Sequence, residues 1–260
     1  MVETQIPANA VSGGDRQRGI DRVITLLEAL LRHRAPIRPA ELARMIGAPR
    51  STTYEIINRL VEAEMLEPSG SDGQIYFGRA MHLFGWAYGH HNAHYRRIAE
   101  ALDRLAAEGQ ATAQVCALRG NKYVVLDSRD GPGPFRISSD VGAEVPIPWT
   151  ASGRLLLGHL SDAQIRDFIP AQDFRLPRGD MLDVADFIAE VRLSTGRGYA
   201  RTLGLADNFT CCLAVPITSA RGAVDTTLCY VLPADADQAR QDQALDLLRP
   251  VARQLSLAGP

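Results

Sequence analysis

The sequence PAELARMIGAPRSTTYEIINRL, from Pro39 to Leu60, decides the fold of the N-terminal part of the chain. Pro39 stands in the first turn of a helix, where proline is favoured, and the apolar spacing carries that helix to about Ile46. Residues 47–49 (Gly-Ala-Pro) then form a compact turn. A third helix follows, for which Ser51 and Thr52 are candidate N-caps. Its buried stripe consists of Thr53, Ile56, Ile57, Leu60 and Val61.

The flanking sequence completes a recognisable module. Before this stretch, residues 20–32 carry apolar side chains at helical spacing. After it, residues 65–67 and 74–77 indicate two strands on either side of the glycine-containing turn 69–73. Three helices followed by a hairpin are typical of a winged helix-turn-helix, in which the third helix enters the major groove of DNA.

The outward face of the third helix suits DNA binding. Arginine and asparagine can make bidentate contacts with guanine and adenine edges, and hydroxyls at a helix start can meet phosphates. Nine arginines and four acidic residues lie between Arg16 and Arg59, a local charge of +5 in a chain of net charge −2. The alternative is a helical packing module whose polar face is only solvated. The predicted DNA-binding residues are Arg38, Arg50, Ser51, Thr52, Tyr54, Asn58, Arg59 and Gln74.

Glu55 interrupts this basic surface. A carboxylate that faces DNA weakens binding unless it accepts a hydrogen bond from a cytosine amino group. The spacing Thr52-x-x-Glu55 offers another interpretation, a capping box in which the glutamate folds back onto the helix start. We favour the capping box and leave the cytosine contact open.

A connector and a second domain follow. The connector is expected to hold a helix from about Arg79 to Gly89, and a second helix follows with Ile98, Leu102 and Leu105 as its apolar stripe. Between the two helices lie the histidines His90, His91 and His94. These histidines could ligate a metal, but no acidic or cysteine partner follows them in sequence, so we predict no metal site. From about residue 110 onward, short strands, inserted helices and a terminal hairpin indicate an antiparallel sheet with helices on its faces, an α+β domain. The expected strands include residues 112–118, 122–128, 135–138, 211–218 and 224–231.

Composition sets further limits. The chain has 260 residues, 46% of them hydrophobic and 22% charged, as in an ordinary soluble globular protein. No apolar run is long enough to span a membrane, and residues 1–18 lack the pattern of a secretory signal. The four cysteines include no C-x-x-C spacing, so they predict neither a zinc site nor a disulfide framework. We therefore expect a cytoplasmic protein without a membrane partner and without a cofactor.

Two sets of motifs resemble one family. Residues 18–30 (RGIDRVITLLEAL) and 39–60 resemble the DNA-binding domain of IclR-type bacterial transcriptional regulators. Residues 145–154 (VPIPWTASGR), 198–200 (GYA) and 212–217 (CLAVPI) resemble the effector domain of the same family, which is related to GAF-type sensor folds. The resemblance implies a disordered arm (1–17), a winged helix-turn-helix (18–78), a linker helix (79–95) and an effector-binding domain (96–260).

The same resemblance implies function and partners. It implies a regulator of a catabolic operon that binds a double-stranded DNA operator and a small organic acid effector. The connector helix is expected to pair two chains into a homodimer, and such dimers are expected to pair further into a tetramer.

Departures from the family pattern inform the effector. Relatives that bind small oxoacids carry an aspartate, a cysteine and two serines where this chain has Thr202, Cys212, Cys229 and Val231. Buried polar ligand atoms without partners cost about 1–3 kcal/mol each, so these changes favour a larger aromatic or medium-sized organic acid. The helix start near Thr150 offers backbone amides to its carboxylate. The predicted effector-binding residues are Phe135, Trp149, Ser152, Gly153, Thr202, Cys212, Cys229 and Val231.

Other classes of function are less well supported. An enzyme needs a nucleophile and a base in one pocket, and Cys212, the plausible nucleophile, has no histidine near it in sequence. We therefore predict no catalytic residues. A redox- or metal-responsive regulator that uses Cys211 and Cys212 is the alternative. However, adjacent strand residues point to opposite faces, so only one of these cysteines can line a pocket.

Overall fold

The structure is a computed structural model that describes residues 15–133, 135, 141–219 and 222–258. The predicted arm, residues 1–17, lies mostly outside the described residues, but its last three residues belong to the first helix, which begins at Asp15. The chain divides into two compact units, Met1–Ala87 and Tyr88–Pro260. No helix of the described residues is long and apolar enough to cross a membrane.

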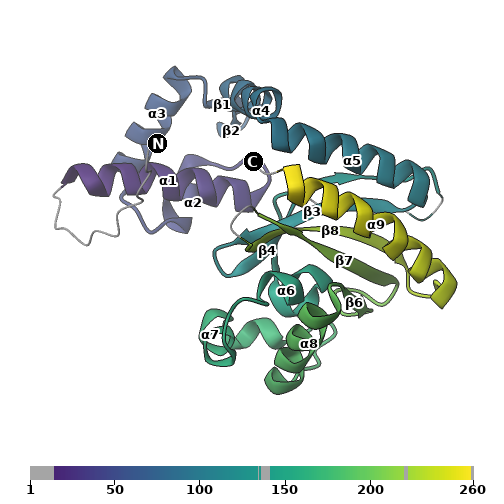
Figure 1. The fold of residues 1–260 in the computed structure, drawn as a ribbon. Helices are drawn as coiled ribbons and strands as arrows, with labels where there is room; N and C mark the ends of the chain where they lie inside the picture. Colours follow the sequence, from purple (N-terminus) through teal and green to yellow (C-terminus); the bar gives the residue numbers. More distant parts are fainter. Residues whose placement is uncertain (1–14, 134, 136–140, 220–221, 259–260) are drawn as a thin grey trace, which may run out of the picture. The chain divides into compact units, whose positions relative to one another are not determined.

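The first unit is a winged helix-turn-helix (Figure 1). Its elements are α1 (Asp15–His33), α2 (Pro39–Met45), α3 (Arg50–Glu62), β1 (Leu66–Ser69), β2 (Gln74–Phe77) and most of α4 (Arg79–His91). Strands β1 and β2 form an antiparallel hairpin, and Ile37 adds an isolated bridge to Ile75. One core cluster unites α1, α2, α3 and the hairpin through buried residues that include Leu26, Leu42 and Ile57. The predicted order of elements is therefore confirmed.

The second unit is built on a six-stranded antiparallel sheet with the order β5-β4-β3-β8-β7-β6. The central strands contribute alternating side chains to two separate cores, one on each face. The strands are β3 (Thr112–Arg119), β4 (Lys122–Arg129), β5 (Glu144–Pro146), β6 (Ala200–Leu203), β7 (Thr210–Thr218) and β8 (Val224–Pro233). The α+β prediction is confirmed.

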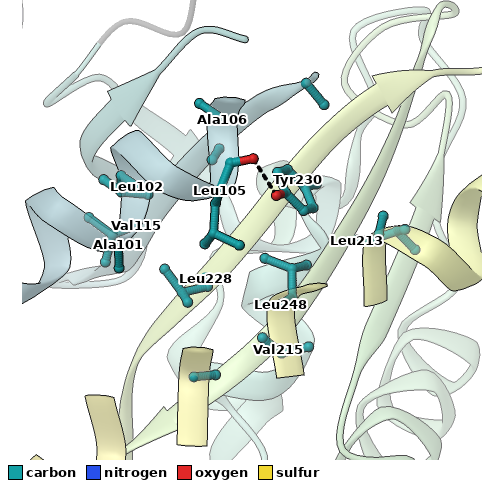
Figure 2. Close-up of a cluster of buried hydrophobic side chains, with 14 of the residues drawn as sticks. Ala101, Leu102, Leu105, Ala106, Val115, Leu213, Val215, Leu228, Tyr230 and Leu248 are labelled. Carbon is teal, nitrogen blue, oxygen red and sulfur yellow. Dashed lines mark hydrogen bonds between the residues drawn. The ribbon is translucent and has the colours of Figure 1, made fainter. Parts of the chain in front are cut away.

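Two long helices, α5 (Ala93–Gly109) and α9 (Gln238–Ala258), cover one face of the sheet (Figure 1). At the centre of this core, the fully buried Tyr230 donates a hydrogen bond from its hydroxyl to the Leu105 carbonyl at 2.5 Å (Figure 2). The carbonyl thereby satisfies a phenol that would otherwise be buried without a partner.

Shorter helices cover the opposite face (Figure 1). They are η1 (Ile147–Trp149), α6 (Ala151–Leu156), α7 (Asp162–Phe168), η2 (Ala171–Phe174) and α8 (Val184–Arg197). The predicted strand 135–138 is not found at Phe135, and its remaining residues lie outside the described part of the chain. The edge strands β5 and β6 were not predicted, because three or four residues are too few to show alternation.

The connector region holds two helices, as the apolar spacing predicted. Helix α4 ends at His91, and α5 begins at Ala93 with Asn92 as its N-cap. The Asn92 side chain accepts a hydrogen bond from the Tyr95 amide at 2.9 Å. The cap marks the boundary between the two helices, so the last residues of the predicted linker 79–95 belong to α5.

Candidate functional site

The outward face of α3 is the first candidate site. Thr53, Ile57 and Leu60 are buried on the inner face and hold the helix against α1 and α2. The opposite face is open to solvent and carries predicted DNA-binding residues. Its exposed members are Arg50, Ser51, Tyr54, Glu55, Asn58 and Arg59.

The start of α3 corrects one prediction. The helix begins at Arg50, its N-cap is Pro49, and no side chain caps it. Ser51 and Thr52 therefore lie inside the first turn, and the capping box between Thr52 and Glu55 was wrong. The reason is that Pro49 has a fixed φ and needs no hydrogen-bond acceptor, so helical geometry starts directly after it. Glu55 remains exposed on the surface.

Three further predicted residues flank this face. Thr52 is half-buried on α3, and Gln74 is half-buried at the start of β2. Arg38 is exposed at the N-cap of α2, where its guanidinium lies 4.0 Å from the carboxylate of Asp72 in the hairpin turn. Arg59 makes an exposed ion pair with Glu62 at 3.1 Å. Exposed ion pairs of this kind contribute little to stability. Arg38 and Arg59 can therefore leave their carboxylate partners and bind a phosphate or a base of DNA instead.

The second candidate site is a cavity of about 290 Å³ in the sheet unit. It lies on the face of the sheet that carries η1 and α6. Strands β3, β4, β7 and β8 supply its floor, and the segment between β6 and β7 supplies one wall. The lining residues are Gln114, Tyr123, Val125, Ala143, Val145, Trp149, Thr150, Ala151, Ser152, Ala206, Asp207, Thr210, Cys212, Cys229 and Val231.

The structure brings five of the eight predicted effector residues to this cavity. They are Trp149, Ser152, Cys212, Cys229 and Val231. The other three lie elsewhere. Phe135 lines a different cavity beside α5 and α9, and Thr202 lines a cavity at the β6 edge of the sheet.

Gly153 is the third predicted effector residue that does not line the cavity. It lies where α6 packs closely against η1. A Cβ atom placed there would lie 2.5 Å from the Ile147 carbonyl oxygen and 2.9 Å from Thr150 Oγ1. Its amide donates to Thr150 Oγ1 at 3.0 Å, so that amide is not free for a ligand. The amides of Ala151 and Ser152, at the first two positions of α6, have no acceptor within the helix.

Trp149 is held in place by a buried network. Its indole N–H donates to the Asp173 carbonyl oxygen at 2.9 Å, which fixes the ring at the cavity wall. The Asp173 side chain is only 4% exposed and pairs with Lys122, whose Nζ lies 2.6 Å from Oδ1. Since a buried carboxylate is costly without such a partner, Lys122 stabilises the position of η2 and thereby that of Trp149.

The cavity contains a carboxylate that sequence reasoning missed. Asp207 follows β6, and no basic side chain is found among the described lining residues. Its Oδ1 accepts from the Phe209 amide at 2.9 Å, and its Oδ2 accepts from Thr210 Oγ1 at 2.9 Å. The family resemblance implied an aspartate only at the position that Thr202 occupies in this chain, so residue 207, in a loop, gave no signal.

Other polar groups were also missed. Gln114 and Tyr123 are buried on β3 and β4, far in sequence from the motifs that indicated the site. Gln114 is the register partner of Cys229, so a correct strand pairing would have found it. Ser152 Oγ is buried without an oxygen or nitrogen partner among the described residues; the Cys116 thiol is its polar neighbour.

The cysteines divide between the two faces of the sheet. Cys211 belongs to the core under α5 and α9, whereas Cys212 lines the cavity. The structure therefore separates the vicinal pair, as strand alternation predicted. A hydrogen bond with the Cys229 thiol lowers the pKa of Cys212 and raises that of Cys229. Cys212 is thus the thiol of this pair that loses its proton first.

The described residues show no group of three side chains placed to hold a metal ion. No histidine occurs among the described residues of the cavity lining. The arrangement fits binding of a small molecule between an aromatic wall and a few hydrogen-bonding groups.

Comparisons with known proteins also divide the chain into an N-terminal and a C-terminal domain. A family model described as the IclR helix-turn-helix domain matches residues 19–70. A second, described as the bacterial transcriptional regulator IclR C-terminal domain, matches residues 89–257. The HTH-type transcriptional regulator TtgV of Pseudomonas putida is 30% identical over 148 residues, which are 56% of this chain and 56% of that protein.

Solved structures share the fold. The IclR transcriptional regulator from Alicyclobacillus acidocaldarius has a TM-score of 0.83 at 20% identity, over 92% of this chain and 98% of that chain. An IclR homologue from Microbacterium hydrocarbonoxydans, solved in complex with 4-hydroxybenzoate, has a TM-score of 0.76 at 21% identity over the same shares.

Proposed function

Because the chain belongs to the IclR family of bacterial transcriptional regulators, we propose that it controls a catabolic operon in response to an aromatic or medium-sized organic acid. The ligand binds in the cavity beside Trp149, and α3 reads the operator. The observation that carries the effector assignment is the lining of this cavity, where an indole ring and aliphatic side chains surround a small set of polar groups.

The walls disfavour a very small oxoacid. Cys229 and Val231 stand at the two positions of β8 where hydroxyls would bind such a ligand, and both line the cavity. A small, strongly polar acid would leave its oxygens without partners against these side chains, which costs about 1–3 kcal/mol per group. A flat apolar ring, in contrast, gains contact with Trp149.

The charge of the cavity orients the ligand. A carboxylate next to Asp207 would be repelled, so the acid group belongs at the other polar region, near the amides of Ala151 and Ser152 and the hydroxyl of Ser152. A hydroxyl on the far side of the ring could then donate to Asp207. The 4-hydroxybenzoate found in the Microbacterium hydrocarbonoxydans homologue has this two-ended chemistry.

Ligand binding raises thermal stability, and this tests the effector class. We expect 4-hydroxybenzoate or benzoate to raise the melting temperature of the full chain more than glyoxylate or pyruvate at equal concentration, because only the aromatic acids bury a ring against Trp149. Trp149→Leu should weaken the aromatic acid about tenfold or more in calorimetry.

The control for this substitution is Leu193→Ala, which shortens a side chain that is 54% exposed on α8 and outside the cavity. That variant should bind like the unmodified chain. Tight binding of glyoxylate or pyruvate, with none of aromatic acids, would show that the wall substitutions do not exclude small oxoacids.

Operator recognition is assigned to α3 and its surroundings. The proposed contacts are Arg38, Arg50, Ser51, Thr52, Tyr54, Asn58, Arg59 and Gln74, with base readout centred on Arg50, Asn58 and Arg59. We assign no catalytic residue and no cofactor. A regulator that binds the chromosome acts in the cytoplasm, and we propose that location.

We further propose a homodimer that pairs into a tetramer. Helix α4 has no buried side chain and exposes Leu83, Phe84, Trp86 and Tyr88, each by 58–60%. Such an apolar helix face is typical of an interface. Light scattering at micromolar concentration should give two or four times the mass of one chain.

Two substitutions test the role of α4. Leu83→Glu with Phe84→Glu should yield monomers, because two charges cannot be buried unpaired in the interface. Met181→Glu, at an equally exposed apolar side chain outside α4, should leave the assembly unchanged. A monomeric unmodified chain, with or without DNA, would contradict the proposal.

A further inference from the structure

A second cavity of the sheet unit, about 370 Å³ in volume, is lined by basic side chains. It lies at the β6 edge of the sheet, between α8 and α9, and the cavity beside Trp149 does not share its charged residues. Its charged lining residues are Arg154 from α6, Glu190 and Arg197 from α8, and Arg201 from β6. Three guanidiniums thus face a single carboxylate among the described lining residues.

Arg154 is the most unusual of these residues, because its side chain is only 5% exposed. Its Nη1 donates to the carbonyl oxygens of Thr150 at 2.7 Å and Pro148 at 3.3 Å, and the guanidinium lies 5.2 Å from the centre of the Phe187 ring. Its Nε has no hydrogen-bond partner. Within the described ranges, Arg154 makes no ion pair.

Burial of an unpaired cation is costly. Burial lowers the pKa of Arg154 to about 10, Glu190 opposes this shift, and the nearby charge of Arg197 adds to it. The guanidinium nevertheless stays protonated at neutral pH. A bound anion would supply the missing counter-charge and accept from the donors that are unused.

The other two arginines also keep free donors. Arg197 uses Nε to donate to the Tyr199 carbonyl oxygen at 2.8 Å and stacks 4.4 Å from the centre of the Tyr199 ring. Arg201 donates from Nη1 to Gln241 Oε1 at 2.9 Å. Arg197 Nη2 also donates to Ser194 Oγ at 3.4 Å. These contacts orient both guanidiniums, but each retains further N–H groups that donate to no acceptor in the described part of the chain.

We propose that this cavity binds a compact phosphoryl group, either inorganic phosphate or the phosphate of a small ester. Three guanidiniums and one carboxylate leave two positive charges, which match a phosphate dianion. The planar fork of arginine also suits two oxygens of a phosphate at once. The site differs from the effector cavity in both its residues and its charge.

The experiment is calorimetric titration of the full chain with inorganic phosphate at constant ionic strength in chloride buffer. We expect one phosphate per chain at this site. Arg201→Gln and Arg154→Met should each weaken it about tenfold or more, because each removes a charge-assisted contact. Glu190→Gln should bind phosphate more tightly, since it removes the opposing carboxylate. A parallel titration with glycerol 3-phosphate distinguishes free phosphate from an ester.

Controls separate this site from other basic surfaces. Arg166→Gln, at an exposed arginine on α7, removes the same charge outside the cavity and should bind normally. The double variant Arg50→Ala with Arg59→Ala should also bind phosphate with the affinity of the unmodified chain. Should Arg154→Met lose its fold by circular dichroism, Arg201→Gln decides. The proposal would be overturned if neither inorganic phosphate nor glycerol 3-phosphate bound the chain saturably. It would also be overturned if the Arg201→Gln variant bound phosphate as tightly as the unmodified chain.

Discussion

Replacing Arg50 and Arg59 together by alanine should lower the affinity of the full chain for its operator about a hundredfold or more. Both side chains are exposed, Arg50 at the start of α3 and Arg59 about two and a half turns further along. A bidentate contact with a base contributes about 1–3 kcal/mol of discrimination, and a dimer makes each contact twice. The residual binding should also depend less steeply on salt, because fewer phosphate charges are neutralised.

The measurement is fluorescence anisotropy of a labelled operator at several salt concentrations. The matched control is Arg104→Ala with Arg166→Ala, which removes the same charge from exposed positions in the other unit. It should bind the operator normally. Unchanged affinity of the Arg50 and Arg59 variant, with its helical content intact, would show that α3 does not read the DNA.

Gly153→Ala should be the most destabilising of the small substitutions at the cavity. The new methyl group would lie 2.5 Å from the Ile147 carbonyl oxygen and 2.6 Å from the Ile147 Cγ2 atom. Neither η1 nor the buried α6 can move away without opening the core, so we expect a loss of about 2 kcal/mol or more in the free energy of unfolding. Effector binding should weaken as well, because α6 and Trp149 border the same cavity.

Urea unfolding of the full chain measures this effect. Gly196→Ala is the control, since a Cβ there meets nothing within 4 Å and the residue is exposed within α8. That variant should be as stable as the unmodified chain or up to about 1 kcal/mol more stable. If Gly153→Ala kept full stability and lost only the ligand, Gly153 would be a ligand contact after all.

Periodicity predicted the elements that contain enough residues to show it. The spacing of apolar residues located α3, which buries one regular face. Runs of apolar residues located β7 and β8, which are buried on both faces of the sheet. The start of α3 was misplaced because Ser51 and Thr52 are good caps by residue type, whereas Pro49 imposes the helix start by its backbone. Strands β5 and β6 are too short for any periodic signal.

The candidate cavity was predicted where one strand or one motif contributes several residues. Alternation predicted that only one of Cys211 and Cys212 lines the cavity, and the family resemblance pointed to Cys212, which is the one found there. Asp207 could not be predicted in the same way, because a loop residue has no periodicity and its position depends on how the chain returns from β6 to β7. Thr202 pairs with Cys212 at the edge of the sheet and lines the neighbouring cavity, an arrangement that depends on the strand order and not on the local sequence.

The most direct test is to let the full chain select binding sites from a randomised DNA library. It tests whether α3 recognises an operator and whether the chain binds that operator as a dimer whose affinity depends on a ligand. We expect enrichment of a two-fold symmetric sequence with half-sites about one helical turn apart, and a changed affinity for that sequence when 4-hydroxybenzoate or benzoate is added. The variant without Arg50 and Arg59 should enrich no such sequence. The account would be contradicted if the unmodified chain enriched no symmetric site, or if the variant without Arg50 and Arg59 enriched the same site as the unmodified chain.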